Sequence, residues 1–249
     1  MAMQHLRGFE IAKPLEEEYL YEIPAIKYLR EFSFNAPVTI FVGENGSGKS
    51  TLLEALAVCC GFNPEGGTRN FNFATAETHS SLHKSLRLTR SMPFPSNGFF
   101  LRAESFYNVS TEVNRLKDSG LDSEESKKHF MQHYGGKSLH SQSHGESFMS
   151  LAINRFQGNS LFFLDEPEAA LSPSRQLALL SRIYELASAN SQFIIATHSP
   201  VIMSCPGAEV YELTGDGVSL TPYDKTAHFS AMRQFMENPE RMLHYLLQD

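Results

Sequence analysis

The stretch Gly43-Glu44-Asn45-Gly46-Ser47-Gly48-Lys49-Ser50, followed by Thr51, matches the pattern G-x-x-x-x-G-K-[ST] of a phosphate-binding loop. The apolar, β-branched run at 38–42 in front of it is typical of a buried strand. Residues 51–58 behind it have the composition of a helix, and Gly61 supplies a stop. Because a glycine loop turns N–H groups inward and a helix N-terminus adds partial positive charge, this order predicts a triphosphate site.

Two side chains of the loop have predicted roles beyond that of the backbone. Lys49 is long enough to reach the β- and γ-phosphates, and Ser50 offers a hydroxyl group to Mg²⁺. We therefore expect residues 43–51 to bind a nucleoside triphosphate together with Mg²⁺. A chance glycine-rich turn is the alternative interpretation, and it leaves the flanking strand and helix unexplained.

The composition limits the classes of protein to which this chain can belong. A chain of 249 residues with 41% hydrophobic and 20% charged residues is typical of a globular protein with ample core. The net charge of -7 argues against a strongly basic nucleic-acid binder and leaves only a local patch, such as Lys84, Arg87 and Arg90. The three cysteines indicate neither a disulfide framework nor a zinc site. Since no apolar run approaches the ~20 residues that span a bilayer, we expect a cytoplasmic protein without membrane insertion.

A second apolar run, at residues 161–164, ends in the two carboxylates Asp165 and Glu166. A buried strand would deliver both to the edge of the sheet where ligands bind in open α/β folds. Asp165 suits the Mg²⁺ shell, through water, and Glu166 suits polarising the attacking water. The alternative is an ordinary helix N-cap, because Ser172-Pro173 just beyond also resembles a cap.

Two more predicted strands end in candidate site residues. Residues 192–197 form an apolar run that ends at His198, which we expect beside the Asp165 strand, within reach of the γ-phosphate or the attacking water. A structural histidine is the alternative. Residues 98–104 form another buried strand with Glu104 at its carboxyl end.

The remaining segments complete one predicted domain over residues 1–249. It comprises an N-terminal antiparallel β part with the phosphate loop (1–104), a small helical lobe (105–150), a second half of the core (151–225) and C-terminal helices (226–249). The lobe is too short for a long coiled coil. A helix is predicted at 174–189, and its apolar face comprises Leu177, Leu180, Ile183, Tyr184 and Ala187. The apolar positions of the C-terminal helices are predicted to pack in the core; the alternative is that they line a groove for a partner.

As an ordered set, these motifs resemble the ATP-binding-cassette class of P-loop ATPases over nearly the whole chain. Residues 43–51 match its Walker A loop and residues 161–166 its Walker B strand. Residues 170–172 are similar to its D-loop, and residues 197–199 to its switch-histidine segment. Within the class, the chain looks like the SMC/RecF-type and stand-alone "AAA domain, predicted ATPase" group, and less like transporter subunits.

The resemblance extends to Ser143-His144-Gly145-Glu146, which looks like the class signature. It implies that Ser143, Gly145 and Glu146 contact a nucleotide, although a serine that caps an amphipathic helix is a sufficient structural explanation of the stretch alone. The chain departs from the class in two places. His144 replaces the first signature glycine, and Glu104 stands where the class has a glutamine, so that Glu104 becomes a candidate ligand of Mg²⁺.

The function that the resemblance implies is ATP hydrolysis coupled to a dimer switch. Lys49, Glu166 and His198 of one chain would face Ser143 and Gly145 of a second, with ATP between them. The ATP-dependent homodimer would act on an unknown effector protein or on a nucleic acid, in DNA maintenance or anti-phage defence. The alternatives are the ATP-binding subunit of a membrane transporter and, with less support from the motifs, a P-loop kinase.

Overall fold

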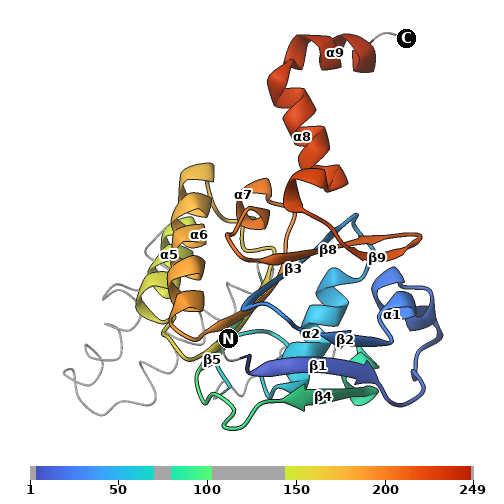
Figure 1. The fold of residues 1–249 in the computed structure, drawn as a ribbon, viewed down its shortest axis with the longest axis vertical. Helices are drawn as coiled ribbons and strands as arrows, with labels where there is room; N and C mark the ends of the chain where they lie inside the picture. Colours follow the sequence, from blue (N-terminus) through green and yellow to red (C-terminus); the bar gives the residue numbers. More distant parts are fainter. Residues whose placement is uncertain (1–3, 70–79, 103–143, 248–249) are drawn as a thin grey trace.

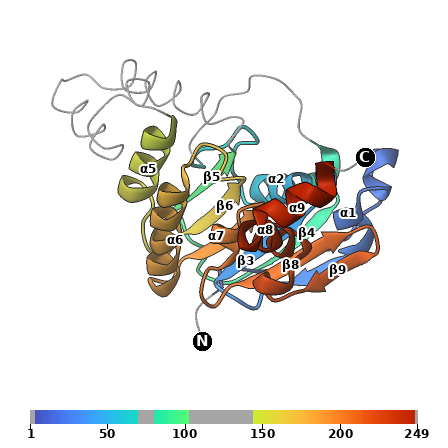
Figure 2. The same ribbon diagram turned by 90° about the horizontal axis from the view of Figure 1, so that it is seen from above.

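The computed structural model describes residues 4–69, 80–102 and 144–247, and its strands form two sheets (Figures 1 and 2). The larger sheet has the order β5-β6-β7-β3-β8-β9, in which all neighbours are parallel except the final pair. Its strands are β3 (Val38–Gly43), β5 (Gly98–Arg102), β6 (Leu161–Asp165), β7 (Gln192–Ala196), β8 (Glu209–Thr214) and β9 (Gly217–Leu220). The predicted α/β fold is therefore confirmed, and β8 and β9 form an antiparallel hairpin at the edge of this sheet.

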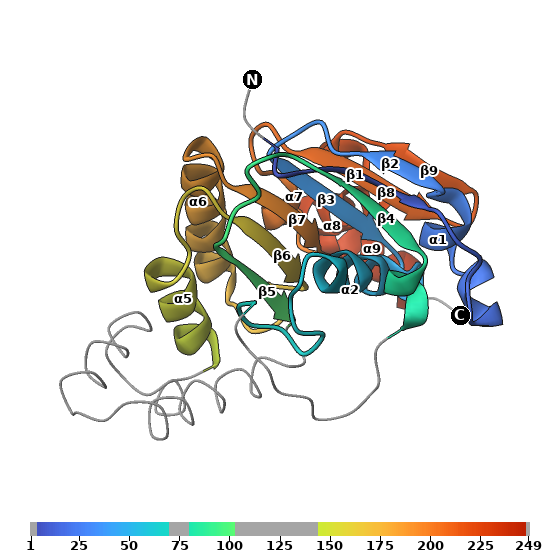
Figure 3. The same cartoon turned by 90° about the horizontal axis from the view of Figure 1, so that it is seen from below.

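Both faces of the large sheet are covered, which explains why β6 and β7 are buried along their whole length. Alternate residues of β3 enter different cores: Val38, Ile40 and Val42 face one side, and Phe41 faces the other. The first side packs against α5 (His144–Asn154), α6 (Pro173–Ser188) and α7 (Pro200–Met203). The second packs against α2 (Lys49–Cys59) and the small sheet (Figure 3).

The small sheet is the antiparallel β part that the sequence predicted. It has the order β2-β1-β4 and contains β1 (Leu6–Ile11), β2 (Glu31–Ser33) and β4 (Leu86–Arg90). Within the predicted antiparallel β part, the chain between β1 and β2 is helical, with the 3₁₀ turn η1 (Glu18–Tyr21) and α1 (Pro24–Tyr28). Proline at the first helical position favours this outcome. A second 3₁₀ turn, η2 (Ser81–Lys84), precedes β4.

The buried face of α6 differs from the predicted one. Leu179, Ile183 and Leu186 are its buried residues, whereas Leu177 and Tyr184 are 58% and 52% exposed. The steps of four and three residues between the buried positions trace one stripe of a helix. Leu177 and Tyr184 lie on a neighbouring stripe, and the sequence pattern alone made the two stripes look alike.

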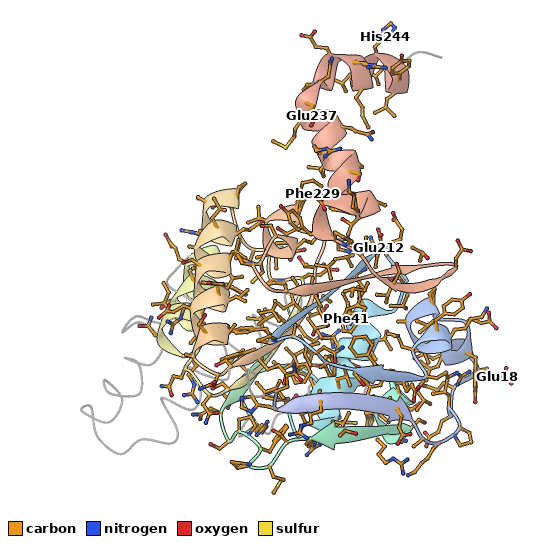
Figure 4. All side chains as sticks on the ribbon, viewed as in Figure 1. Glu18, Phe41, Glu212, Phe229, Glu237 and His244 are labelled. Atoms are coloured by element: carbon orange, nitrogen blue, oxygen red, sulfur yellow. The ribbon has the colours of Figure 1, made fainter. Side chains whose placement is uncertain are left out.

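The C-terminal helices correct a second expectation. After the 3₁₀ turn η4 (Tyr223–Lys225), α8 (Ala227–Glu237) and α9 (Pro239–Leu247) project away from the sheets as an arm (Figure 1). Neither helix contains a buried residue, so the predicted packing of their apolar positions in the core is wrong. Figure 4 shows His244 far from Phe41, which lies inside the body. None of the helices described here has the length and apolar character needed to cross a membrane.

Candidate active site

The parallel strands bring the predicted site residues to one edge of the large sheet. β6, β7 and β3 are neighbours, with Asp165 beside Ala196 and Ala196 beside Phe41. Their carboxyl ends therefore meet, and each is followed directly by a predicted site segment. The phosphate loop follows β3, Glu166 follows β6, and His198 lies two residues beyond β7.

Glycine residues shape the phosphate loop between β3 and α2. Gly46 and Gly48 have φ angles of 83° and 91°, in a region that residues with a Cβ atom rarely adopt. At Gly48 a Cβ atom would also overlap the side chain of Ile23. Because α2 begins at Lys49, directly after this turn, its unpaired N-terminal N–H groups lie next to the loop.

Lys49 is held over the loop by backbone carbonyl groups. Its Nζ donates to the carbonyl oxygens of Gly43 at 2.8 Å and of Glu44 at 3.0 Å, although the residue is only 4% exposed. Burial lowers the pKa of Lys49, whereas the charges of Glu166 and Asp165 raise it. An ammonium group fixed among loop carbonyls in this way can bind phosphate oxygens.

Ser50 and Asp165 join α2 to β6 at the floor of the site. Ser50 Oγ donates to Asp165 Oδ1 at 2.8 Å. A hydroxyl and a carboxylate fit Mg²⁺, which takes oxygen ligands and completes its shell with water and phosphate oxygens. The residues present therefore suit the predicted metal, and Ser50 and Asp165 are the candidates to hold it.

An ion pair that the sequence analysis missed supports this floor. Arg102, the last residue of β5, pairs with Glu54 of α2, and its Nε lies 4.0 Å from Asp165 Oδ2. The Glu54 side chain is only 9% exposed. The available signal was Glu54 itself, a charged residue inside the otherwise apolar helix stretch 51–58. Buried charges of this kind are normally paired.

Glu166 lies at the mouth of the site in an unusual backbone conformation. Its φ angle is 47°, in the left-handed region, and its N–H donates to the carbonyl oxygen of Ala196 at 2.9 Å. Strained backbone is common at functional sites, where the surrounding structure holds it in place. The Oε1 atom of Glu166 lies 3.7 Å from Nε2 of His198, so the two predicted catalytic side chains are brought together.

His198 is held by contacts from both sides. Glu168 accepts a hydrogen bond from the backbone N–H of His198 at 2.6 Å, and the ring of His228 lies 5.6 Å from the His198 ring. Burial and the Lys49 charge lower the pKa of His198, although Glu166 and Glu168 act in the opposite direction. Among the described residues, the buried Nε2 of His198 has no hydrogen-bond partner.

Glu168 and His228 were also missed by the sequence analysis. Glu168 could have been predicted from the sequence, because it is the last acid of the Asp-Glu-Pro-Glu stretch. His228 could not, because it lies at the start of α8, thirty residues after His198, and only the tertiary structure places the two rings together.

Two pockets flank the phosphate loop. One has a volume of about 660 Å³ and lies over the loop, and the other, of about 340 Å³, lies between the loop, the β8–β9 hairpin and the start of α8. Both volumes are in the range typical of small-molecule sites. The first is lined by Ile23, Asn45, Gly46, Gly48, Lys49, Ser50, Thr51, Glu166 and His198.

The signature residues lie elsewhere. Gly145 packs against the segment after β6, since a Cβ atom there would lie 2.6 Å from the Ala170 carbonyl oxygen. Glu146 Oε1 lies 3.3 Å from Nη2 of Arg175, in α6. Neither residue lines the two pockets beside the phosphate loop. Ser143 and Glu104 lie outside the described residues, as does most of the predicted helical lobe.

Comparison with known proteins identifies the family. A family model described as an AAA domain matches residues 26–198, well over half of the chain. A curated relative, the "ABC transporter G family member STR2" of Medicago truncatula, is 26% identical over 177 residues. That match covers 66% of this chain and only 24% of the relative's length.

Two solved structures align with the chain at low sequence identity. A nucleotide-free ATP-binding cassette from an ABC transporter aligns with a TM-score of 0.50 and 16% identity, over 97% of this chain and 99% of that one. The SMC head domain from Thermotoga maritima aligns with a TM-score of 0.41 and 16% identity, over 88% of this chain and 99% of that one. The chain belongs to the AAA domain family, and it has the fold of an ATP-binding cassette.

Proposed function

We propose that the protein hydrolyses ATP at sites that are completed only when two copies of the chain close on each other. The observation that carries this proposal is the position of the signature helix. The start of α5 contacts the segment around Ala170 and α6, on the face of the sheet opposite to α2. In the described part of the chain, no residue of α5 lines either pocket at the phosphate loop. This position supports a second chain as the source of Ser143 and Gly145 at the phosphate loop.

In the proposed reaction each residue of the edge has its own task. Lys49 binds the β- and γ-phosphates, and Ser50 and Asp165 hold Mg²⁺. When bound, Mg²⁺ neutralises phosphate charge as it develops. Glu166 accepts a proton from the attacking water, and His198 orients that water or the γ-phosphate. The 3.7 Å between Glu166 and His198 supports their action on a single water.

Mixing two inactive variants tests the composite site. Lys49→Ala inactivates the phosphate loop, and Ser143→Arg inactivates the signature, so each homodimer has two dead sites. In an equal mixture half of the dimers are mixed, and each has one intact site, so we expect about a quarter of the wild-type rate. A rate no higher than the sum of the separate variants would refute a shared site.

Trapping provides an independent measurement. Glu166→Gln should bind ATP without hydrolysing it and accumulate as a dimer, visible as a doubled mass in the presence of ATP and Mg²⁺. The Lys49→Ala/Glu166→Gln variant is the matched control and should remain at its ATP-free mass. A Glu166→Gln variant that binds ATP and stays monomeric would contradict the switch.

We infer that closure acts on a partner protein or a nucleic acid. The motif resemblance to the SMC/RecF-type group supports this inference, whereas the names of the relatives found support the ATP-binding subunit of a transporter as the second candidate. The basic patch offers little free charge, since Lys84 lies 2.9 Å from Glu16 and Arg87 pairs with Glu10. ATPase rates with and without duplex DNA distinguish the two candidates. A rate that DNA stimulates favours the nucleic-acid partner. An unchanged rate, together with co-purification of an integral membrane protein, favours the transporter.

A further inference from the structure

A small polar pocket lies at the edge of the large sheet opposite to the phosphate loop. It is formed where β5 and β6 begin and where α5 has just ended, and it has a volume of about 50 Å³. We call it the arginine pocket. Its lining residues are Thr68, Arg69, Ser96, Asn97, Gly98, Arg155, Gln157, Ser160 and Phe162. Two arginines, three hydroxyl groups and two side-chain amides thus line it, and none of the described lining residues is acidic.

Arg69 is fixed in place and yet retains unused donors. Its guanidinium group lies between the rings of Phe62 and Phe94, with its carbon 4.8 Å from each ring centroid. Its Nη1 donates to the carbonyl oxygen of Pro95. Its Nε and Nη2 are buried and have no hydrogen-bond partner among the described residues, and the same holds for the buried Nε of Arg155. Three buried nitrogen atoms therefore lack an acceptor within the described part of the chain, and a buried donor without an acceptor normally costs free energy.

The arginine side chains of this region also lack carboxylate partners among the described residues. Within the described ranges, no carboxylate forms a salt bridge with Arg69, Arg155 or the neighbouring Arg90. Arg90 lies on the ring of Phe94, with its guanidinium carbon 4.9 Å from the centroid. Burial lowers the pKa of Arg69, and the charge of Arg90 acts in the same direction although Cys60 opposes it. Burial likewise lowers the pKa of His5, with a further contribution from the charge of Arg69. The positive charge concentrated here thus has no carboxylate counter-ion among the described residues.

We propose that the arginine pocket binds one oxyanion of the phosphate or sulfate class. Planar guanidinium groups present paired donors that match the oxygens of such an anion, and the hydroxyl and amide groups supply further donors. A water needs about 10–15 Å³ of pocket volume, so this pocket holds roughly four water-sized atoms, the number of oxygens in phosphate. A nucleotide is far too large. The bound anion links the segment at 68–69, the starts of β5 and β6, and the end of α5.

Thermal unfolding with inorganic phosphate tests the proposal. Because the phosphate loop also binds phosphate, every variant carries Lys49→Ala, and chloride at matched ionic strength is the reference. At ten times the dissociation constant, phosphate should raise Tm by about 3–5 °C in Lys49→Ala. Phosphate also stabilises proteins non-specifically, so the decisive quantity is the difference between variants. Adding Arg155→Gln should abolish the specific rise.

Two further variants keep the test decisive. Arg87→Gln, which removes an exposed arginine paired with Glu10, is the matched control and should retain the full rise. Arg155→Lys keeps the positive charge but loses the paired N–H donors of the guanidinium group, so it should bind phosphate more weakly. Equilibrium dialysis with labelled phosphate measures this affinity. The comparison remains available if the Arg155→Gln variant folds poorly. The proposal would be overturned if phosphate raised Tm equally in Lys49→Ala and in Lys49→Ala/Arg155→Gln. It would also be overturned if equilibrium dialysis found less than one phosphate bound per Lys49→Ala chain. A stronger response to glycerol phosphate than to inorganic phosphate would identify a phosphate ester as the source.

Discussion

The nucleotide edge of the sheet and the α8–α9 arm distribute their side chains in opposite ways. At the edge, charged groups are buried: Lys49 is 4% exposed and Asp165 is 7% exposed. In the arm, large apolar groups are exposed: Met236 is 73% exposed and Leu246 is 69% exposed. Each arrangement reverses the usual preference of its residue types.

The difference lies in what compensates each arrangement. The buried charges at the edge have partners, such as the Gly43 carbonyl for Lys49 and Ser50 for Asp165. The arm relies on local helix interactions, including the Thr226 side chain, which accepts from the Phe229 N–H at 3.3 Å, and the Arg233–Glu237 pair at 3.6 Å. Such interactions contribute only about 0.3–1 kcal/mol each. The edge should therefore be sensitive to single substitutions, and the arm tolerant of them.

The largest effect is expected for Glu166→Gln. Removing the carboxylate removes the proposed proton acceptor, so kcat should fall by about 10²–10⁴-fold while ATP binding persists. Phosphate release and nucleotide-binding titrations measure the two quantities. Glu185→Gln, on the exposed surface of α6, serves as the control and should keep the wild-type rate. A kcat within a few-fold of wild type would remove Glu166 from the proposed mechanism.

The next effect concerns the ion pair beneath the site. Arg102→Met leaves the buried Glu54 carboxylate without this partner, so the free energy of unfolding should fall by about 3 kcal/mol. The double variant Arg102→Met/Glu54→Met should recover much of the loss, because it removes both charges. Urea unfolding measures all three proteins. Additive losses in the double variant would mean that the pair is not coupled.

A smaller effect should appear in the pH dependence of stability. Burial lowers the pKa of His198 in the folded protein; Lys49 and His228 also oppose its protonation, and Glu166 and Glu168 favour it. As pH falls through about 6.5, the unfolded chain takes up a proton that folded His198 takes up only at lower pH, so stability decreases. One proton limits this slope to about 1.4 kcal/mol per pH unit. Urea unfolding from pH 8 to pH 5 should show a shallower decline for His198→Gln than for wild type, and parallel curves would contradict the assignment.

The smallest effect is expected in the arm. Leu246→Ala should change the free energy of unfolding by no more than about 0.5 kcal/mol, as is usual for exposed positions. Leu53→Ala in α2, which is fully buried, should cost about 2–5 kcal/mol in the same assay. A loss of 2 kcal/mol or more from the arm variant would show that its apolar surface is packed in solution and would remove the contrast with the edge.

Prediction from sequence succeeded where one short segment contains all the information. The strand, glycine loop and helix around residues 38–58 are contiguous, and the apolar runs that became β6 and β7 are long enough to be recognised without their neighbours. Prediction was less successful where burial depends on distant segments. The stripe of α6 that faces the core was assigned partly wrongly, and the tail was assigned to the core although it projects from it.

The sequence by itself determined the chemistry of the phosphate loop, because glycine conformations, a helix start and the Lys49-Ser50 pair are all local properties. It also predicted that Asp165, Glu166 and His198 lie at the carboxyl ends of the strands that became β6 and β7. Only the tertiary structure decided the pairing of Arg102 with Glu54, the contact of His198 with His228 and the arginine pocket at the opposite edge. These depend on strand order and on helix placement. The free energy of many distant apolar contacts sets both, and no local pattern encodes them.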